Sequence, residues 1–129
     1  MSKHQDRHAL RVENLTRGQT LVQAGRVADS FFARMRGLIG SAPPAPGEGL
    51  LIIPCSSVHT HFMGFPIDVL YVNASRMVVG IDHALQPWHV GRFYRQVHFV
   101  LELPAGTAQR TATQVGDQLQ VEGLRPARS

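Results

Sequence analysis

The sequence lacks most of the features that would place a chain outside the ordinary globular proteins. It has a single cysteine, Cys55, so no disulfide bond can form within the chain. No stretch approaches the roughly 18 consecutive apolar residues that a membrane-spanning helix needs. The first residues, 1–8, are polar and charged and lack the apolar run of a signal peptide. A free thiol without an export signal predicts a cytoplasmic protein with no membrane span.

Basic charge is present but not concentrated. The formal net charge of +4 and the isoelectric point of about 10.2 make nucleic acid a partner to consider. The arginines are scattered, however, with Arg34/Arg36 and Arg92/Arg95 as the closest pairs, and Lys3 is the only lysine. This pattern favours a solvated arginine surface over a nucleic-acid site.

The size and composition predict one folded unit. The mass of 14.2 kDa suits a single domain, and a hydrophobic content of 43% is enough to build a core without a metal or disulfide framework. We therefore expect a disordered tail at residues 1–9, a single β domain at 10–123 and a C-terminal tail at 124–129.

Short segments of strand-type residues, separated by turns, recur along the chain. They predict strands at residues 10–14, 20–24, 50–53, 67–72, 77–81, 97–103 and 118–123, and residues 57–62 can also be extended. Gly25 is expected to end the second strand, and a loop is expected over 83–95. Most connections are too short for helical crossovers, so the sheet should be largely antiparallel.

One helix is predicted near the N-terminus. Asp29 or Ser30 can cap it, and the apolar residues that follow have helical spacing up to Gly40. Thr107 can cap one or two further helical turns, and Asp117 reads as a turn residue. The expected fold is mainly β, a small antiparallel β-sandwich or barrel with one short N-terminal helix.

Three segments together resemble an uncharacterised family, domain of unknown function 192. They are residues 35–38 with 49–52, residues 59–63 leading to 65–72, and residues 100–108 with 115–117. The resemblance covers roughly residues 10–122. It implies a compact, jelly-roll-like β fold and no established reaction. Many members have Phe-Trp-Met-Lys-Asn where this chain has His-Phe-Met-Gly-Phe, within His-Thr-His-Phe-Met-Gly-Phe-Pro-Ile-Asp, so it resembles a divergent branch.

The densest polar cluster lies between Cys55 and Asp68. If this segment is extended, Cys55, His59 and His61 share one side, and thiolate and imidazole groups are ligands for zinc or copper. The same cysteine could instead act as a nucleophile with a histidine as its base. The structural alternative is a small buried cysteine and hydrogen-bonded or exposed histidines. The pattern requires no cofactor.

Two further features could contribute to a site. Asp68 lies in an otherwise apolar strand, where a carboxylate accepts hydrogen bonds from backbone N–H groups or contacts a ligand. The backbone of the 63–66 turn, or a nearby arginine or histidine, is the expected partner. The 83–95 loop carries Trp88 and Arg92, which suit stacking on a planar ligand or packing back on the core.

These residues support three functional hypotheses. The preferred one is a binding module for a small polar ligand or a protein, with His59, His61, Asp68, Trp88 and Arg92 as candidate contacts. The alternative is a metal-dependent or cysteine-dependent enzyme, so enzymatic activity stays open. The third is weak nucleic-acid binding through the basic surface.

Overall fold

The computed structural model describes residues 10–28, 45–53, 65–86 and 94–123. Within these ranges the chain is mainly β, as predicted. The elements are β1 (Leu10–Asn14), β2 (Gln19–Ala28), β3 (Leu50–Ile52), β4 (Ile67–Val72), β5 (Val78–Leu85), β6 (Phe99–Pro104), the short helix α3 (Thr107–Arg110) and β7 (Leu119–Glu122). The helix predicted after Ser30 and the extended segment at 57–62 lie outside the described residues.

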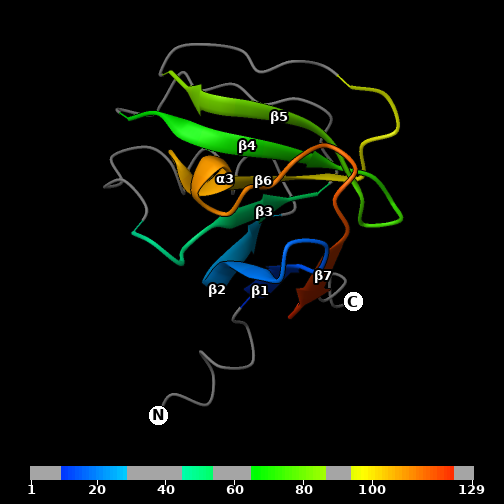
Figure 1. Cartoon of the computed structure of the whole chain (residues 1–129), viewed down its shortest axis with the longest axis horizontal. Helices are drawn as coiled ribbons and strands as arrows, with labels where there is room; N and C mark the ends of the chain where they lie inside the picture. The colour runs from blue at the N-terminus through cyan, green and yellow to red at the C-terminus, as the bar shows by residue number, and fades with distance from the viewer. Residues whose placement is uncertain (1–9, 29–44, 54–64, 87–93, 124–129) are drawn as a thin grey trace.

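The strands form one curled sheet that makes a half-barrel (Figure 1). Their order is β5-β4-β6-β3-β2-β1-β7. The long strand β2 joins two parts of this sheet, because its first half pairs with β1 and its end pairs with β3. Figure 1 shows β1, β2 and β7 set at an angle to the strands from β3 to β5.

Most strand pairs are antiparallel, as expected, and β2–β3 is the parallel exception. A parallel pair needs a connection of about a dozen residues or more. Residues 29–49 provide that length between β2 and β3, whereas the hairpin turns β1–β2 and β4–β5 are too short for it.

The two ends of the strand order meet at one point. Met77, just before β5, forms an isolated antiparallel bridge with Gln118, just before β7. The Val78 N–H also donates to the Asp117 carbonyl at 2.9 Å, and the Gly116 N–H donates to the Val78 carbonyl at 2.8 Å. This bridge brings the two ends of the half-barrel together at one point.

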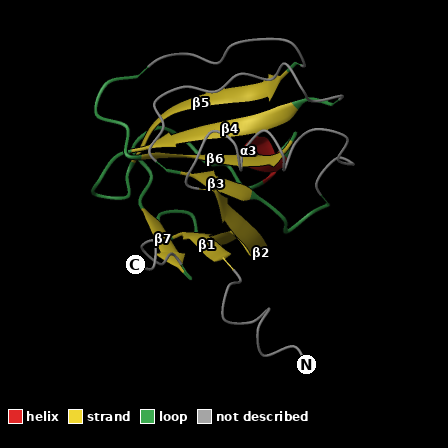
Figure 2. Cartoon of the chain, turned by 180° about the vertical axis from the view of Figure 1, so that it is seen from behind, coloured by secondary structure: helices red, strands yellow, loops and turns green. Residues whose placement is uncertain are grey.

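Buried apolar side chains lie on both faces of the sheet. All six residues of β4 are buried, which confirms its prediction as a central strand. Leu70 and Val72 point into the larger cluster, which includes residues of β1, β2, β7 and α3, while Val69 and Tyr71 belong to a second cluster on the opposite face. Figures 1 and 2 place α3 on one side of the sheet only, the side of the larger cluster.

Two strands run further than predicted. Gly25 pairs with Leu10 inside β2 and does not end the strand. A Cβ at Gly25 would lie 2.8 Å from the Gly49 carbonyl oxygen, so glycine is present here because two backbones approach closely. The 83–95 loop also starts later than predicted, because β5 continues to Leu85, which pairs with Ile67.

Candidate functional site

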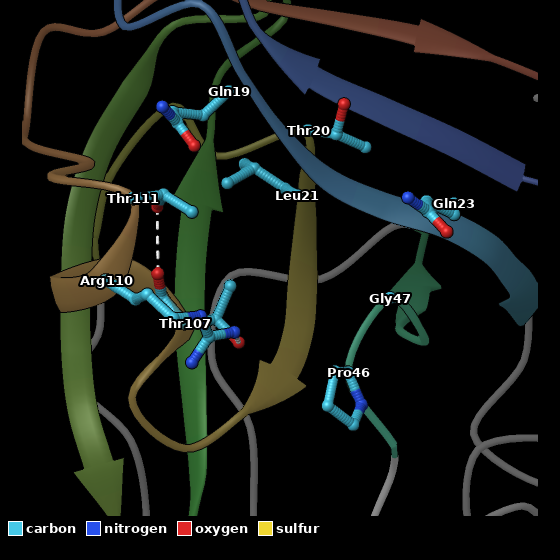
Figure 3. Close-up of a pocket in the computed structure, with 9 residues that line it drawn as sticks. All are labelled: Gln19, Thr20, Leu21, Gln23, Pro46, Gly47, Thr107, Arg110 and Thr111. Carbon is cyan, nitrogen blue, oxygen red and sulfur yellow. Dashed lines mark hydrogen bonds between the residues drawn. The ribbon is translucent and has the colours of Figure 1, made fainter.

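A pocket of about 380 Å³ lies between β2 and α3 (Figure 3). Figure 3 shows α3 and its flanking residue forming one wall, with Gln23 and the 46–47 turn opposite. The lining residues come from three separate segments: Gln19, Thr20, Leu21, Gln23, Pro46, Gly47, Thr107, Arg110 and Thr111. The volume is in the range of small-ligand sites.

An irregular strand shapes the β2 wall. The β1–β2 pairing passes from Val12↔Val22 to Glu13↔Thr20, which leaves Leu21 as an extra residue on β2. Such a bulge redirects neighbouring side chains. Leu21 is therefore buried at the pocket, while Gln19 and Gln23 are exposed around it. The pocket thus has one buried apolar side chain, Leu21, flanked by the exposed amide groups of Gln19 and Gln23.

The opposite wall depends on the turn that follows β6. Gly106 has a φ of +94°, a conformation that glycine adopts without strain, and it is the N-cap of α3 in place of the predicted Thr107. The Thr107 hydroxyl donates to the Pro104 carbonyl at 2.7 Å, and the Thr111 hydroxyl donates to the Thr107 carbonyl at 2.8 Å. Both hydroxyl groups are thus engaged within the wall, while Arg110 is exposed.

Asp68 stabilises this wall through hydrogen bonds to backbone N–H groups. Its buried carboxylate accepts hydrogen bonds from the backbone N–H groups of Ala84 (2.8 Å), Gly106 (3.1 Å) and Ala108 (2.8 Å). Ala84 has a positive φ of 49°, so the carboxylate stabilises a backbone conformation that is sparsely populated for a residue other than glycine. Asp68 is not among the residues that line the pocket, and in this geometry it positions α3.

The second face of the sheet carries two more buried carboxylates. Val69 pairs with Asp82 on one side and Glu102 on the other, so the two acids flank it on the same face. The Tyr71 hydroxyl donates to Asp82 at 2.6 Å, and the Tyr94 ring lies 4.5 Å from the Tyr71 ring. Tyr71 and Asp82 each have a further interaction, and Glu102 has an interaction partner as well. These polar groups are therefore engaged inside the fold.

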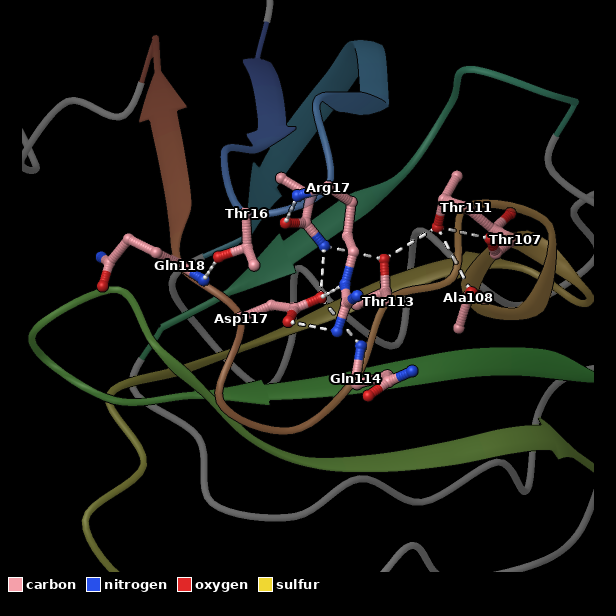
Figure 4. Close-up of polar contacts among 10 residues, drawn as sticks. Thr16, Arg17, Thr107, Ala108, Thr111, Thr113, Gln114, Asp117 and Gln118 are labelled. Carbon is pink, nitrogen blue, oxygen red and sulfur yellow. Dashed lines mark hydrogen bonds and ion pairs between the residues drawn. The ribbon is translucent and has the colours of Figure 1, made fainter.

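A hydrogen-bonded cluster surrounds the point where the barrel closes (Figure 4). Arg17 binds both carboxylate oxygens of Asp117, with Nε 2.9 Å from Oδ2 and Nη2 3.1 Å from Oδ1. Asn14 donates to Asp117 at 2.9 Å and to Thr113 at 3.0 Å, and the Gln114 N–H also donates to Asp117. We call Asn14, Arg17, Thr113, Gln114 and Asp117 the closure network.

The closure network determines the ionisation of Asp117. Burial alone would raise the pKa of this carboxyl group, but the hydrogen bonds from Arg17, Asn14 and the Gln114 backbone outweigh burial and lower the pKa. The network also reaches the pocket, because the Thr113 and Thr111 hydroxyl oxygens are 2.8 Å apart. Asp117 is thus more than the turn residue that the sequence indicates.

Most of the residues that the sequence singles out are not covered by the structure. Cys55, His59, His61, Trp88 and Arg92 lie outside the described residues, so the zinc or copper site and the cysteine nucleophile stay predictions. Within the described ranges no group of three histidine, cysteine or acidic residues could hold a metal ion. No helix in that part of the chain is long and apolar enough to cross a membrane.

Sequence reasoning missed the pocket residues. A partial signal exists on the α3 side, since Thr107, Arg110 and Thr111 are spaced three and four apart and share one face of a helical turn. On the β2 side Gln19, Leu21 and Gln23 are spaced two residues apart, which is the spacing of side chains on one face of a strand. Neither pattern indicates that the two segments face each other.

Comparison with known proteins identifies relatives over most of the chain. The model of the family described as Uncharacterized ACR, domain of unknown function 192, matches residues 12–121. A UPF0127 protein of Thermococcus sibiricus is 32% identical over 117 residues, which is 84% of this chain and 73% of that protein. A UPF0127 protein of Pyrococcus furiosus is 32% identical over 115 residues, 83% of this chain and 94% of that protein.

Solved structures share the fold. A putative transcription regulator from Sinorhizobium meliloti superimposes with a TM-score of 0.75 and 25% identity, covering 89% of this chain and 93% of that one. A protein of unknown function from Novosphingobium aromaticivorans has a TM-score of 0.74 and 19% identity, covering 87% and 83%. The second likeness bears on the fold alone.

Proposed function

The chain belongs to the uncharacterised family of domain of unknown function 192, and we propose that it is a binding module that holds a small polar ligand between β2 and α3. The observation that carries the proposal is the pocket of about 380 Å³. It combines a buried apolar residue, Leu21, with amide and guanidinium groups at its edge. Most of the lining residues are polar, so the ligand that suits this pocket is itself polar.

The construction of the walls supports binding over a role in packing. Asp68 and the threonine hydroxyls hold the α3 wall through hydrogen bonds within the protein. Backbone N–H groups of Gln23 and Ala24 donate to the Gly47 carbonyl, at 2.7 and 3.1 Å, and hold the opposite wall. A site with fixed walls loses little entropy when a ligand enters.

A blocking variant tests the proposal. Glucose, glycine, succinate and inorganic phosphate would each be titrated while backbone amide resonances are followed by NMR. We expect at least one probe to shift resonances of β2, the 46–47 turn and α3 together. Gln23→Trp should cover the pocket, because Gln23 packs against Gly47 at its edge, and should weaken that binding about tenfold or more.

Gln120→Trp is the matched control. Gln120 is also an exposed strand glutamine, but it lies on β7 and does not line the pocket. It should leave binding unchanged. If no probe shifts these resonances, or if Gln23→Trp binds as the unmodified protein does, the pocket is not a binding site.

DNA binding is a second candidate. The description of the Sinorhizobium meliloti protein as a putative transcription regulator favours it, together with the net charge of +4 here. Affinity for a short DNA duplex, measured by fluorescence anisotropy, should then fall steeply as salt is raised, because phosphate contacts release counterions. No binding at low salt would reject this candidate.

A further inference from the structure

We infer that the pocket selects a small organic anion bearing carboxylate or phosphate groups, and that the Arg110 guanidinium is its anchor. This inference rests on the proposed function and adds the chemical class of the ligand. Three observations support it: Arg110 has N–H donors that the protein does not use, the pocket lining carries a positive charge, and Gln23 and Leu21 lie across the pocket from Arg110.

Arg110 uses little of its hydrogen-bonding capacity within the protein. A guanidinium group has five N–H donors, and among the described residues Arg110 makes one side-chain contact, from Nη2 to the Thr107 hydroxyl oxygen at 3.5 Å. That separation exceeds the usual 2.7–3.2 Å of such bonds. No carboxylate among the described residues forms an ion pair with Arg110. Its planar donor groups therefore remain available for an oxyanion.

The lining of the pocket has the sign that an anion requires. Arg110 is the single charged residue among the nine that line it, and none of them is acidic. Glu48 follows Gly47 in the chain, but its carboxylate accepts a hydrogen bond from the Ala45 N–H at 2.8 Å. It therefore stabilises the turn of residues 45–48. An anion that enters would meet one positive charge and no carboxylate in the lining.

The groups across the pocket favour a ligand with polar groups at both ends. Figure 3 shows Gln23 on the side opposite Arg110 and Thr107, with Leu21 between the two sides. An amide can donate to a second oxygen atom while the apolar side chain contacts a short carbon chain. A small dicarboxylate is therefore a suitable probe, and inorganic phosphate tests whether a phosphate group is accepted as well.

The test compares succinate with succinamide, its neutral analogue of similar shape, by calorimetric titration of the full chain. We expect succinate to bind about tenfold or more tightly, because the guanidinium group then pairs with a charged carboxylate and not with a neutral amide oxygen. Arg110→Gln should remove this preference. Arg110→Lys should keep part of it, because charge is retained without the planar pair of donors. Phosphate titrations of the same variants decide which oxyanion is preferred.

Arg95→Gln is the matched control for the change in net charge. Arg95 is exposed and lies in the turn before β6, at the other end of that strand from α3. It should leave succinate affinity within about twofold. The inference is overturned if succinamide binds as tightly as succinate, or if Arg110→Gln does not weaken either anion. If glucose or glycine still shifts the pocket resonances in that case, the proposed function survives; if no probe does, both fail.

Discussion

Two arginines show how differently the same side chain is used in this protein. Arg17 places two nitrogen atoms on Asp117 (Figure 4), and Asn14 donates to the same carboxylate. Arg110 has a single long contact to a threonine hydroxyl and borders a pocket (Figure 3). The two regions are neighbours, since Thr111 lines the pocket and its hydroxyl contacts Thr113 of the closure network.

The difference separates a structural polar cluster from a candidate binding site. A buried carboxylate is stable only when its oxygen atoms are hydrogen-bonded, and Asp117 meets that condition through partners from both ends of the chain. Polar groups that line an open pocket do not need a hydrogen-bond partner within the protein, because water can hydrogen-bond to them. We therefore expect changes in the closure network to affect stability, and changes at Arg110 to affect binding.

The largest effect is expected at Asp68, which supports the pocket wall. Asp68→Ala should lower the free energy of unfolding by about 3–5 kcal/mol, because a buried carboxylate is removed and three backbone N–H groups, one buried and two part-buried, lose their acceptor. Urea denaturation followed by circular dichroism measures the loss. Glu48→Ala, at an exposed carboxylate, should cost about 0.5 kcal/mol or less. A loss below about 1 kcal/mol for Asp68→Ala would contradict its role as the support of α3.

A smaller loss is expected in the closure network. Asp117→Asn should destabilise the protein by about 2–3 kcal/mol, because an amide cannot accept from Arg17, Asn14 and Gln114 as a carboxylate does. Succinate affinity, measured well below the unfolding temperature, should stay within about twofold. If affinity fell about tenfold, the network and the pocket would act as one unit and the comparison would fail.

Acid should weaken the closure network. The pKa of Asp117 is lower in the folded protein than in the unfolded chain, so its contribution is complete above the ordinary aspartate value of about 3.9. The contribution is lost as the pH falls through the lower folded value. Thermal unfolding between pH 7 and pH 2 should show a decline that is shallower in Asp117→Asn. Equal slopes for the two proteins would mean that this carboxyl does not contribute.

The smallest effect on stability is expected at Arg110. Arg110→Gln should change the free energy of unfolding by no more than about 0.5 kcal/mol, because the side chain is exposed and has no ion-pair partner among the described residues. Thermal denaturation measures this while calorimetry records the expected loss of succinate affinity. A destabilisation of about 2 kcal/mol would place Arg110 in the structural class with Arg17.

Much of the strand pattern could be predicted from local sequence. The predictions for β1 and β4 match the structure residue by residue, because alternating or continuous apolar residues bounded by turns report burial directly. The end of β2 could not be predicted. Gly25 resembles a strand terminus, and its real role depends on the backbone of Gly49 that packs against it.

The candidate site was less accessible to prediction. The sequence points to Asp68, but its acceptor role depends on Ala84, Gly106 and Ala108, which are distant in the chain. The pocket requires residues 19–23, 46–47 and 107–111 to converge. No periodicity within one segment reports such convergence, because periodicity reflects only which face of that segment is buried.

The sequence by itself determined the mainly β fold, its turns and its family, since these follow from local apolar patterns and from motifs in a set order. Only the tertiary structure decided which polar residues are engaged and which are open. Asn14 and Asp117 are far apart in the chain yet 2.9 Å apart in space, while Arg110 faces a pocket without a carboxylate. The physical reason is that hydrogen bonds form over a few ångströms, so the partner of a side chain depends on which distant segments the fold places beside it.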